Sequence, residues 1–238
     1  MSILSWITDE KLINAVKFLI NKAILAQNSS EENFEKNVID PFSALFQIAG
    51  LNIDYDAWIV NEKTRQAQKT LQNHIGDFHQ VILGSIAGWQ NLKTGSIVDL
   101  ISEEHQILAE VKNKHNTVKG SDLAGLYKSL ESLVMPKSSK YKGYTAYYVS
   151  IIPRKPDAYN KPFVPSDKEK GEKCAENEKI RMIDGASFYS LVTGEEAALK
   201  NLFDVLPSVI EQITGNSLPK ITKDNLNKFF VQAYGKGL

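Results

Sequence analysis

The sequence predicts an α/β fold with a central mixed β-sheet flanked by helices and a helical N-terminal part. Three observations carry this prediction. Apolar residues recur at helical spacing up to about residue 83, and after Gly95 the chain changes to short segments rich in Ile, Val and Leu. These segments follow the order strand, strand, helix, strand. With 238 residues, 42% of them hydrophobic, the chain is long enough to bury a sizeable core.

Three helices are expected in the first third of the chain. The first opens at Thr8, whose hydroxyl is a suitable N-cap, because apolar residues follow on one helical stripe. The second is expected from near Ser30 to Gly50, broken or kinked by Pro41. The third, longer helix is expected over residues 57–83.

A β-hairpin and a parallel strand are expected next. "SIVDLIS" and "HQILAEVKN" are β-branched and apolar, and "EEH" separates them. A helix with Ser121 as its N-cap follows, and then the aromatic strand 144–152, which Pro153 ends. A crossover of this length makes the strand 144–152 parallel to the one at 106–113.

The remaining chain begins with a segment rich in Pro and Lys, 153–179, which we expect to be a long irregular loop. "IRMIDG" then predicts a short strand. Two helices ended by Gly194 and Gly215 follow, and a short helix is expected near the C-terminus.

Cysteine count and hydropathy narrow the class of protein. The single cysteine, Cys174, excludes an internal disulfide and a CxxC metal site. No apolar run reaches the roughly 18 residues that a membrane helix requires, and the N-terminus lacks the pattern of a signal peptide. We therefore expect a soluble, cytoplasmic protein with no membrane partner.

The charges are unevenly distributed although the net charge is zero. Residues 1–62 carry 4 Lys+Arg against 9 Asp+Glu, residues 63–173 carry 17 against 11, and residues 174–238 carry 7 against 8. A localised basic region is the electrostatic feature that binding to a phosphate backbone requires. Lysines that only keep the surface solvated are the alternative explanation.

The most informative residues are two acids and a lysine on the predicted hairpin. Glu110 and Lys112 face the same way because side chains alternate along a strand, and Asp99 lies on the partner strand. Two neighbouring carboxylates are unfavourable without a counter-charge. Mg²⁺ supplies one, binds few protein carboxylates and activates water, while a lysine stabilises the charge that develops on a phosphate. The pattern therefore predicts catalysis of phosphodiester hydrolysis by Asp99, Glu110 and Lys112.

The alternative is an exposed edge strand whose charged side chains block aggregation. An acid-x-Lys triplet also occurs at Asp9-Glu10-Lys11, but that triplet starts a helix and has no acid upstream. Only Glu110-Val111-Lys112 lies in a predicted strand that an acid-bearing strand precedes.

The stretch "VDL…AEVKNKHNTVKG" resembles the core of the PD-(D/E)XK nucleases, with Asp99, Glu110 and Lys112 at the motif positions and Val98 in place of the usual proline. "QNHIGDFHQVILGSIAGW", this hairpin and "KGSDLAGLY" resemble the type II restriction endonucleases that cut GGNCC-like sites. The resemblance implies a restriction-endonuclease-like core and Mg²⁺-dependent cleavage of double-stranded DNA at a short palindromic site by a homodimer.

The resemblance also assigns roles to individual residues. Asp99 and Glu110 would bind the metal, with the carbonyl of Val111 as a further ligand, and Lys112 would orient or activate the attacking water. Glu62 would be an accessory acid, although an exposed glutamate at a helix start is the other interpretation.

The residues that follow the catalytic strand are suited to contacts with phosphates and base edges. Ser121 begins a helix whose N-terminus suits a phosphate, and loop residues Arg154 and Lys155 are expected to reach the DNA. Asn73 and His74 are accessory candidates. Loop stabilisation is the alternative for His115 and Asn116, and helix packing is the alternative for Asn73 and His74. For Arg154 and Lys155 the alternative is a flexible, solvated loop. The expected contacts after the strand are Asn113, Lys114, His115, Asn116, Thr117 and Lys119.

We expect a single endonuclease domain over residues 1–238. It comprises a helical N-terminal part (1–60), a catalytic core (61–195) and C-terminal helices (196–238). Two other functions remain open from the residues alone. One is a structure-specific or repair nuclease on the same core, and the other is a non-catalytic DNA-binding protein.

Overall fold

The computed structural model describes residues 2–92 and 95–235, and the chain forms two compact units. One unit combines residues 1–15 with 79–238, and the other consists of residues 16–78. Helices α1 (Asp9–Glu32) and α3 (Tyr55–Leu83) each begin in one unit and end in the other. Within the described ranges, no helix is both long and apolar enough to cross a bilayer.

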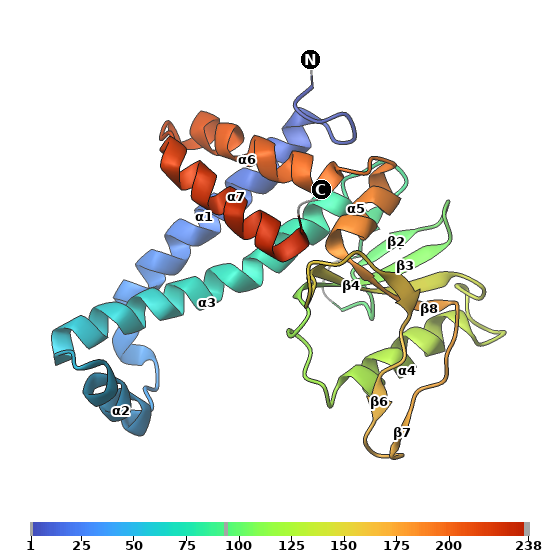
Figure 1. Ribbon diagram of the computed structural model, residues 1–238, viewed down its shortest axis with the longest axis horizontal. Helices are drawn as coiled ribbons and strands as arrows, with labels where there is room; N and C mark the ends of the chain where they lie inside the picture. Colours follow the sequence, from blue (N-terminus) through green and yellow to red (C-terminus); the bar gives the residue numbers. More distant parts are fainter. Residues whose placement is uncertain (1, 93–94, 236–238) are drawn as a thin grey trace. The chain divides into compact units, whose positions relative to one another are not determined.

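The larger unit is built on a six-stranded sheet in the order β1-β2-β3-β4-β8-β5. β4 is central and pairs parallel with both β3 and β8, whereas the outer pairs are antiparallel. The predicted mixed sheet and parallel crossover are therefore confirmed (Figure 1). The strands are β1 (Gln90–Asn91), β2 (Leu100–Ser102), β3 (Ile107–Lys114), β4 (Thr145–Ile152), β5 (Asn160–Pro162) and β8 (Ile180–Asp184).

Helix α4 (Leu123–Val134) covers one face of this sheet (Figure 1). Its buried side chains recur at helical spacing. All of them except Ala124 belong to one apolar cluster with Leu108 of β3 and Ala146 of β4. Because side chains alternate along a strand, the face that carries Leu108 also carries Glu110 and Lys112. The core under α4 thus supports the polar end of β3. The buried residues of α4 are Ala124, Tyr127, Leu130 and Val134.

Helix α5 (Gly185–Thr193) packs on the sheet through Phe188, which is fully buried. The ring of Phe188 lies 6.0 Å from that of Tyr147 on β4 and 5.7 Å from that of Trp89, both measured between centroids. Tyr147 alternates with Tyr148 along β4, so α5 and α4 cover opposite faces of the sheet.

Helices α6 (Ala198–Thr214) and α7 (Lys220–Tyr234) complete the larger unit. Gly194 and Gly215 end α5 and α6 with φ angles of 75° and 72°, which confirms the predicted ends of both helices. α6 and α7 pack through Phe203 and Phe230, whose ring centroids are 4.8 Å apart.

The smaller unit differs from the sequence prediction at its second helix, α2 (Pro41–Leu51). The expected helix start near Ser30 is wrong, because α1 continues through this residue and the Ser30 hydroxyl donates to the carbonyl of Gln27. α2 begins instead at Pro41, whose fixed φ suits the first helical position. A short 3-10 turn, Phe34–Lys36, separates the two helices.

The segment 153–179 is largely irregular, as its composition suggests, but it also contains three short strands. β5 pairs with β8, and β6 (Ser166–Asp167) forms a separate hairpin with β7 (Glu172–Lys173). Proline is compatible with β5 because this strand lies at the sheet edge. Asp167 is 4% exposed and forms an ion pair of 2.8 Å with Lys128, which attaches the hairpin to α4.

The division into two units falls at residues 15 and 78, whereas the sequence suggested boundaries at 60 and 195. The difference arises because α1 and α3 are continuous helices that contribute to both units. That the whole chain functions as one endonuclease domain stays a prediction.

Candidate active site

Asp99, Glu110 and Lys112 come together at the end of the ladder between β2 and β3. The last paired residues of the ladder are Leu100 and Ala109, so Asp99 immediately precedes β2. The expectation that Asp99 lies within a strand is therefore wrong by one residue. Its backbone N–H still donates to the carbonyl of Ala109 at 3.0 Å, which keeps Asp99 beside β3.

The edge of β3 beyond this ladder holds the Asp99 carboxylate in place. The backbone N–H of Val111 donates to Asp99 Oδ2 at 2.8 Å, so a side chain takes the position that a partner strand would occupy. The carbonyl of Val111 accepts a long hydrogen bond of 3.5 Å from Gln80 Nε2 of α3. The carboxylate and this carbonyl therefore lie along the same strand edge.

Lys112 connects the two acids. Its Nζ forms an ion pair with Glu110 Oε1 and lies 4.0 Å from Asp99 Oδ2. The exposed fraction of the side chain is 26% for Lys112, 13% for Glu110 and 21% for Asp99. Solvent therefore screens the three charges only in part. The arrangement confirms that the three predicted residues form one cluster.

The electrostatics of this cluster favour an added cation. Burial and the neighbouring charge of Asp99 raise the pKa of the Glu110 carboxyl above its ordinary value, against the opposing effect of Lys112. Burial lowers the pKa of Lys112, but its hydrogen bond to Glu110 and the two acidic charges outweigh burial and raise it. One lysine therefore remains charged without fully compensating two carboxylates.

Tyr148 of β4 is a polar neighbour that sequence analysis missed. It pairs in register with Glu110, and parallel register places both side chains on the same sheet face. Its hydroxyl is buried, and burial raises its pKa more than the neighbouring Ser150 and Lys112 lower it. The parallel register of "YYVS" against "AEVK" is the signal that could have identified it.

The predicted DNA-contacting segment continues from β3 as a surface turn. The N–H of Lys114 donates to Thr117 Oγ1 at 3.2 Å, and the N–H of Thr117 donates back to the carbonyl of Lys114 at 3.0 Å. His115 N–H donates to the carbonyl of Ile152. Lys114, His115, Asn116, Thr117 and Lys119 are exposed, whereas Asn113 is half-buried.

The other predicted DNA contacts are also placed at the surface. Ser121 is exposed, but it is not the N-cap: Asp122 occupies that position and accepts a hydrogen bond from the Ser121 hydroxyl. Because the helix begins one residue later than expected, Ser121 lies outside its first turn. Arg154 and Lys155 are exposed between β4 and β5.

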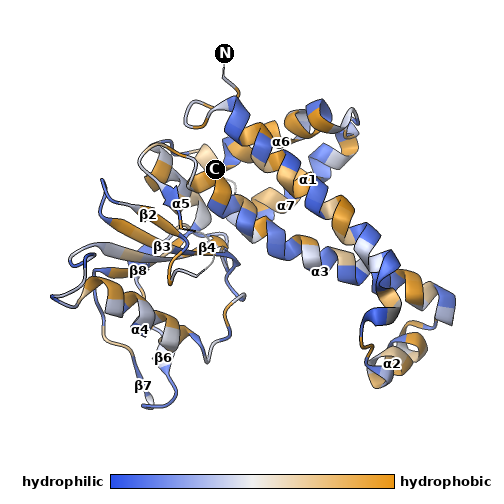
Figure 2. Cartoon of the chain, turned by 180° about the vertical axis from the view of Figure 1, so that it is seen from behind, coloured by the Kyte–Doolittle hydropathy of each residue, from blue (hydrophilic) through white to orange (hydrophobic). Residues whose placement is uncertain are grey.

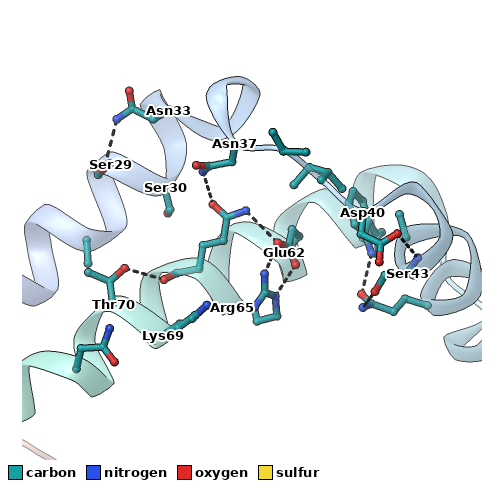
Figure 3. A pocket seen from close by; sticks show the side chains of 18 residues that line it. Ser29, Ser30, Asn33, Asn37, Asp40, Ser43, Glu62, Arg65, Lys69 and Thr70 are labelled. Carbon is teal, nitrogen blue, oxygen red and sulfur yellow. Dashed lines mark hydrogen bonds and ion pairs between the residues drawn. The ribbon is translucent and has the colours of Figure 1, made fainter.

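The three accessory candidates lie in the unit of residues 16–78. Glu62 is 7% exposed, and Arg65 holds its carboxylate through two hydrogen bonds of 2.6 Å, which lowers its pKa despite burial. Glu62 and Asn73 line a cavity of about 790 Å³ in this unit, and Figure 3 shows Arg65 against Glu62. His74 bonds to Asp77 at 3.0 Å. The interpretation of Glu62 as an exposed helix-start residue is wrong, and its role as an accessory acid stays a prediction.

The donor set around Asp99 fits Mg²⁺. Over the described part of the chain, no three His, Cys, Asp or Glu residues are grouped as metal ligands. Mg²⁺ does not require such a group, because it binds through one or two carboxylates and keeps water and phosphate as further ligands. Asp99, Glu110 and the Val111 carbonyl provide the hard oxygen atoms that Mg²⁺ prefers. Burial and the charge of Asp99 together raise the pKa of the Glu110 carboxyl.

Comparisons with known proteins identify the family of the chain and two of its relatives. Residues 4–215 match the family model described as Eco47II restriction endonuclease. The chain is 51% identical to the type II restriction enzyme Eco47II of Escherichia coli over 99% of this chain and 100% of the relative. It is 34% identical to the type II restriction enzyme Sau96I of Staphylococcus aureus, over 87% of this chain and 80% of the relative. No solved structure matches.

Proposed function

The chain belongs to the Eco47II restriction endonuclease family, and we propose that it is a site-specific type II enzyme that uses Mg²⁺ to hydrolyse double-stranded DNA. The proposed target is a short palindromic, GGNCC-like site. Neither a structure-specific nuclease nor a non-catalytic DNA-binding protein is favoured, because both curated relatives are named type II restriction enzymes.

The observation that carries the proposal is the cluster of Asp99, Glu110 and Lys112 on the edge of β3. An aggregation-blocking edge strand would expose its charges to solvent. Here the Glu110 side chain is only 13% exposed, and the Asp99 carboxylate accepts a hydrogen bond from the backbone of Val111. Buried, mutually repelling acids are unfavourable for folding and are expected where function requires them.

Each residue has a defined task in this proposal. Asp99 and Glu110 would hold Mg²⁺, together with the Val111 carbonyl, and the N–H of Val111 keeps the Asp99 carboxylate oriented. When bound, Mg²⁺ neutralises charge on the phosphate and makes a water molecule more acidic. The ammonium of Lys112 donates a hydrogen bond to the attacking water and stabilises negative charge as it develops on the phosphate.

The surface turn after β3 supplies contacts to the DNA. Lys114 and Lys119 are assigned to backbone phosphates because they are exposed cations that follow the catalytic strand directly. Asn113, His115, Asn116, Thr117 and Ser121 are assigned to polar contacts nearby, and Arg154 and Lys155 to base edges or phosphates. We further infer a homodimer, since a palindromic site presents two equivalent strands, and action on DNA in the cytoplasm.

Plasmid cleavage tests the proposed reaction. Incubation with Mg²⁺ should convert a plasmid into discrete fragments whose sequenced ends define one short palindrome, and a chelator should stop the reaction. A smear, cleavage of branched DNA alone, or unchanged plasmid would contradict the assignment to a type II enzyme.

A substitution at Asp99 tests the metal ligands. Asp99→Asn removes a negative charge at the proposed metal site while keeping the shape of the side chain. We expect cleavage to fall by at least about 10³-fold, because removal of a metal ligand disables water activation and charge neutralisation together. DNA binding measured without Mg²⁺ should persist.

Glu103→Gln is the matched control, because Glu103 is an exposed acid in the turn between β2 and β3. This variant should cut like the unmodified protein. Normal cleavage by Asp99→Asn would refute the assignment of Asp99 as a ligand.

A further inference from the structure

Helix α2 combines an uncharged, largely apolar sequence with a surface that is mostly exposed. Its sequence, PFSALFQIAGL, contains no charged residue, yet none of its residues is buried. Phe42, Leu45 and Phe46 are 73%, 63% and 72% exposed. An uncharged, largely apolar helix is normally covered by other protein. Figure 2 shows the apolar colouring along this helix.

The helix is nevertheless firmly defined at both ends. Asp40 Oδ1 accepts hydrogen bonds from the N–H groups of Phe42 and Ser43 at 3.0 and 3.2 Å, as an N-cap does. Asn52 closes the other end in the left-handed conformation, with φ at 53°. An 11-residue helix is marginal in water on its own, so a well-capped helix with so little burial points to packing against a partner.

The two sides of α2 differ in chemistry. Ser43, Ala44 and Gln47 line the polar cavity of this unit, and Gln47 Oε1 accepts a hydrogen bond of 3.0 Å from Trp58 Nε1 of α3. Figure 3 shows Asp40 and Ser43 on this side. The opposite side carries Phe42, Leu45, Phe46 and Ala49, at the spacing of one helical face. We call this second side the α2 apolar face.

The size of the α2 apolar face suits a protein–protein interface. If each aromatic side chain offers about 200 Å², the exposed fractions of Phe42 and Phe46 leave roughly 300 Å² in water. Leu45 adds roughly 60 Å². A standard interface buries about 800 Å² per partner, of which about 450–500 Å² is apolar. The face therefore supplies most of the apolar area that one partner of a stable complex contributes.

The chemistry of the face selects its occupant. DNA is disfavoured, because α2 offers no Lys or Arg to a phosphate backbone. A second copy of the same helix fits, because contact across a two-fold axis sets each residue near its own equivalent. Apolar residues tolerate that arrangement, whereas like charges would repel.

We propose that the α2 apolar face is the contact through which two copies of this chain dimerise. The proposal rests on the proposed function, since cleavage of both strands of a palindrome by one active site per chain calls for two chains. The face lies entirely within residues 41–51, a segment separate from the Asp99 cluster in the sequence.

The molar mass in solution, measured without DNA, tests this interface. The unmodified full chain should sediment at twice the chain mass of 26.6 kDa in the micromolar range. Phe46→Glu places two carboxylates at an apolar contact and should weaken self-association by roughly 100-fold, leaving monomers. Leu45→Glu should act in the same way if one variant folds poorly, and far-UV circular dichroism checks that each variant is helical.

Ile221→Glu on α7 is the matched control, because Ile221 is 72% exposed, as is Phe46. Retention of the dimer by this variant, with its loss in the two α2 variants, supports the interface. An unmodified chain that stays monomeric, α2 variants that stay dimeric, or equal dissociation of Ile221→Glu would overturn it. Because the mass is measured without DNA, failure of plasmid cleavage refutes only the proposed reaction and leaves this result independent.

Discussion

At the scale of single residues, the position of Glu110 in the proposed active site is unfavourable for the stability of the fold. Its carboxyl is largely buried and next to Asp99, and these two influences raise its pKa more than Lys112 lowers it. The folded chain therefore binds a proton at Glu110 more tightly than the unfolded chain does. Ionisation of Glu110 at neutral pH consequently lowers the free energy of unfolding unless a cation binds beside it.

Glu110→Gln should reveal the loss of stability that ionised Glu110 causes. Glutamine resembles the protonated acid, so in chelator the variant should be more stable than the unmodified chain. In the unmodified chain, the stability that protonated Glu110 contributes is fully present below the pKa of Glu110 in the unfolded chain. It is lost as pH rises through the higher pKa of Glu110 in the folded chain. The increase in stability on replacing Glu110 with Gln should therefore be larger at pH 8 than at pH 5. Thermal unfolding at both pH values measures the difference, and plasmid cleavage should be lost.

Excess Mg²⁺ provides an internal check on this prediction. It should stabilise the unmodified chain by mass action and leave Glu110→Gln nearly unchanged. Glu103→Gln, at an exposed acid, should show no comparable pH-dependent gain. An equal melting temperature for Glu110→Gln and the unmodified chain at pH 8 would show that ionised Glu110 does not destabilise the fold.

The residues of the site divide into those that sequence analysis could find and those it could not. Glu110 and Lys112 were predictable as neighbours because strand alternation is local. The hydrogen bond from Val111 to Asp99 joins residues 12 positions apart, and the contact of Gln80 spans 31 positions. Such contacts depend on tertiary structure, which no local pattern specifies. Tyr148 was missed because its position beside Glu110 follows from the register between two strands.

At the scale of elements, close backbone packing joins β8 and α5 to β4. Gly185 follows β8 directly, and a Cβ atom there would lie 2.3 Å from the carbonyl oxygen of Ile151. Neither backbone can move away without disturbing the sheet. The approach therefore requires glycine at this junction.

Gly185→Ala should lower the free energy of unfolding by about 1–3 kcal/mol or more, the usual effect of overpacking. Gly125→Ala in α4 is the matched comparison, because a Cβ there meets nothing within 4 Å. Alanine in that open helical position should raise stability by about 0.5–1 kcal/mol. Urea unfolding of both variants measures whether each change lowers or raises the free energy of unfolding. Equal effects would mean that the contact with Ile151 does not constrain the junction.

The ends of helices were predictable where the backbone adopts a conformation that one residue type, glycine, adopts most easily. Gly194 and Gly215 end their helices at positive φ, as expected for glycine at this position. Serine gave a weaker signal, because its hydroxyl also bonds within a helix, as Ser30 does, or to a neighbouring side chain, as Ser121 does. The short strands between residues 160 and 173 were missed because their pairing partners define them: β5 pairs with β8, and β6 pairs with β7.

At the scale of the whole molecule, the excess of positive charge lies in residues 63–173, which include most of the proposed DNA contacts. The chain is neutral overall, but residues 63–173 hold 17 Lys+Arg against 11 Asp+Glu, and the two acids of the proposed metal site belong to this same region. Binding of Mg²⁺ to Asp99 and Glu110 would make the region more positive still. Affinity for DNA should therefore depend on salt more strongly than the net charge suggests.

The last prediction separates cations that contact phosphates from cations that only solvate the surface. In an Asp99→Asn background, which prevents cleavage, the logarithm of DNA affinity should fall linearly with the logarithm of salt concentration. Lys114→Ala and Lys119→Ala should each make that slope shallower by about 0.9, because each removes one phosphate contact and its released counterion. Lys228→Ala on α7, another exposed lysine, should leave the slope unchanged. An unchanged slope for both turn variants would move the DNA contact away from the segment after β3, whereas a change in only one would identify the single phosphate contact in the turn.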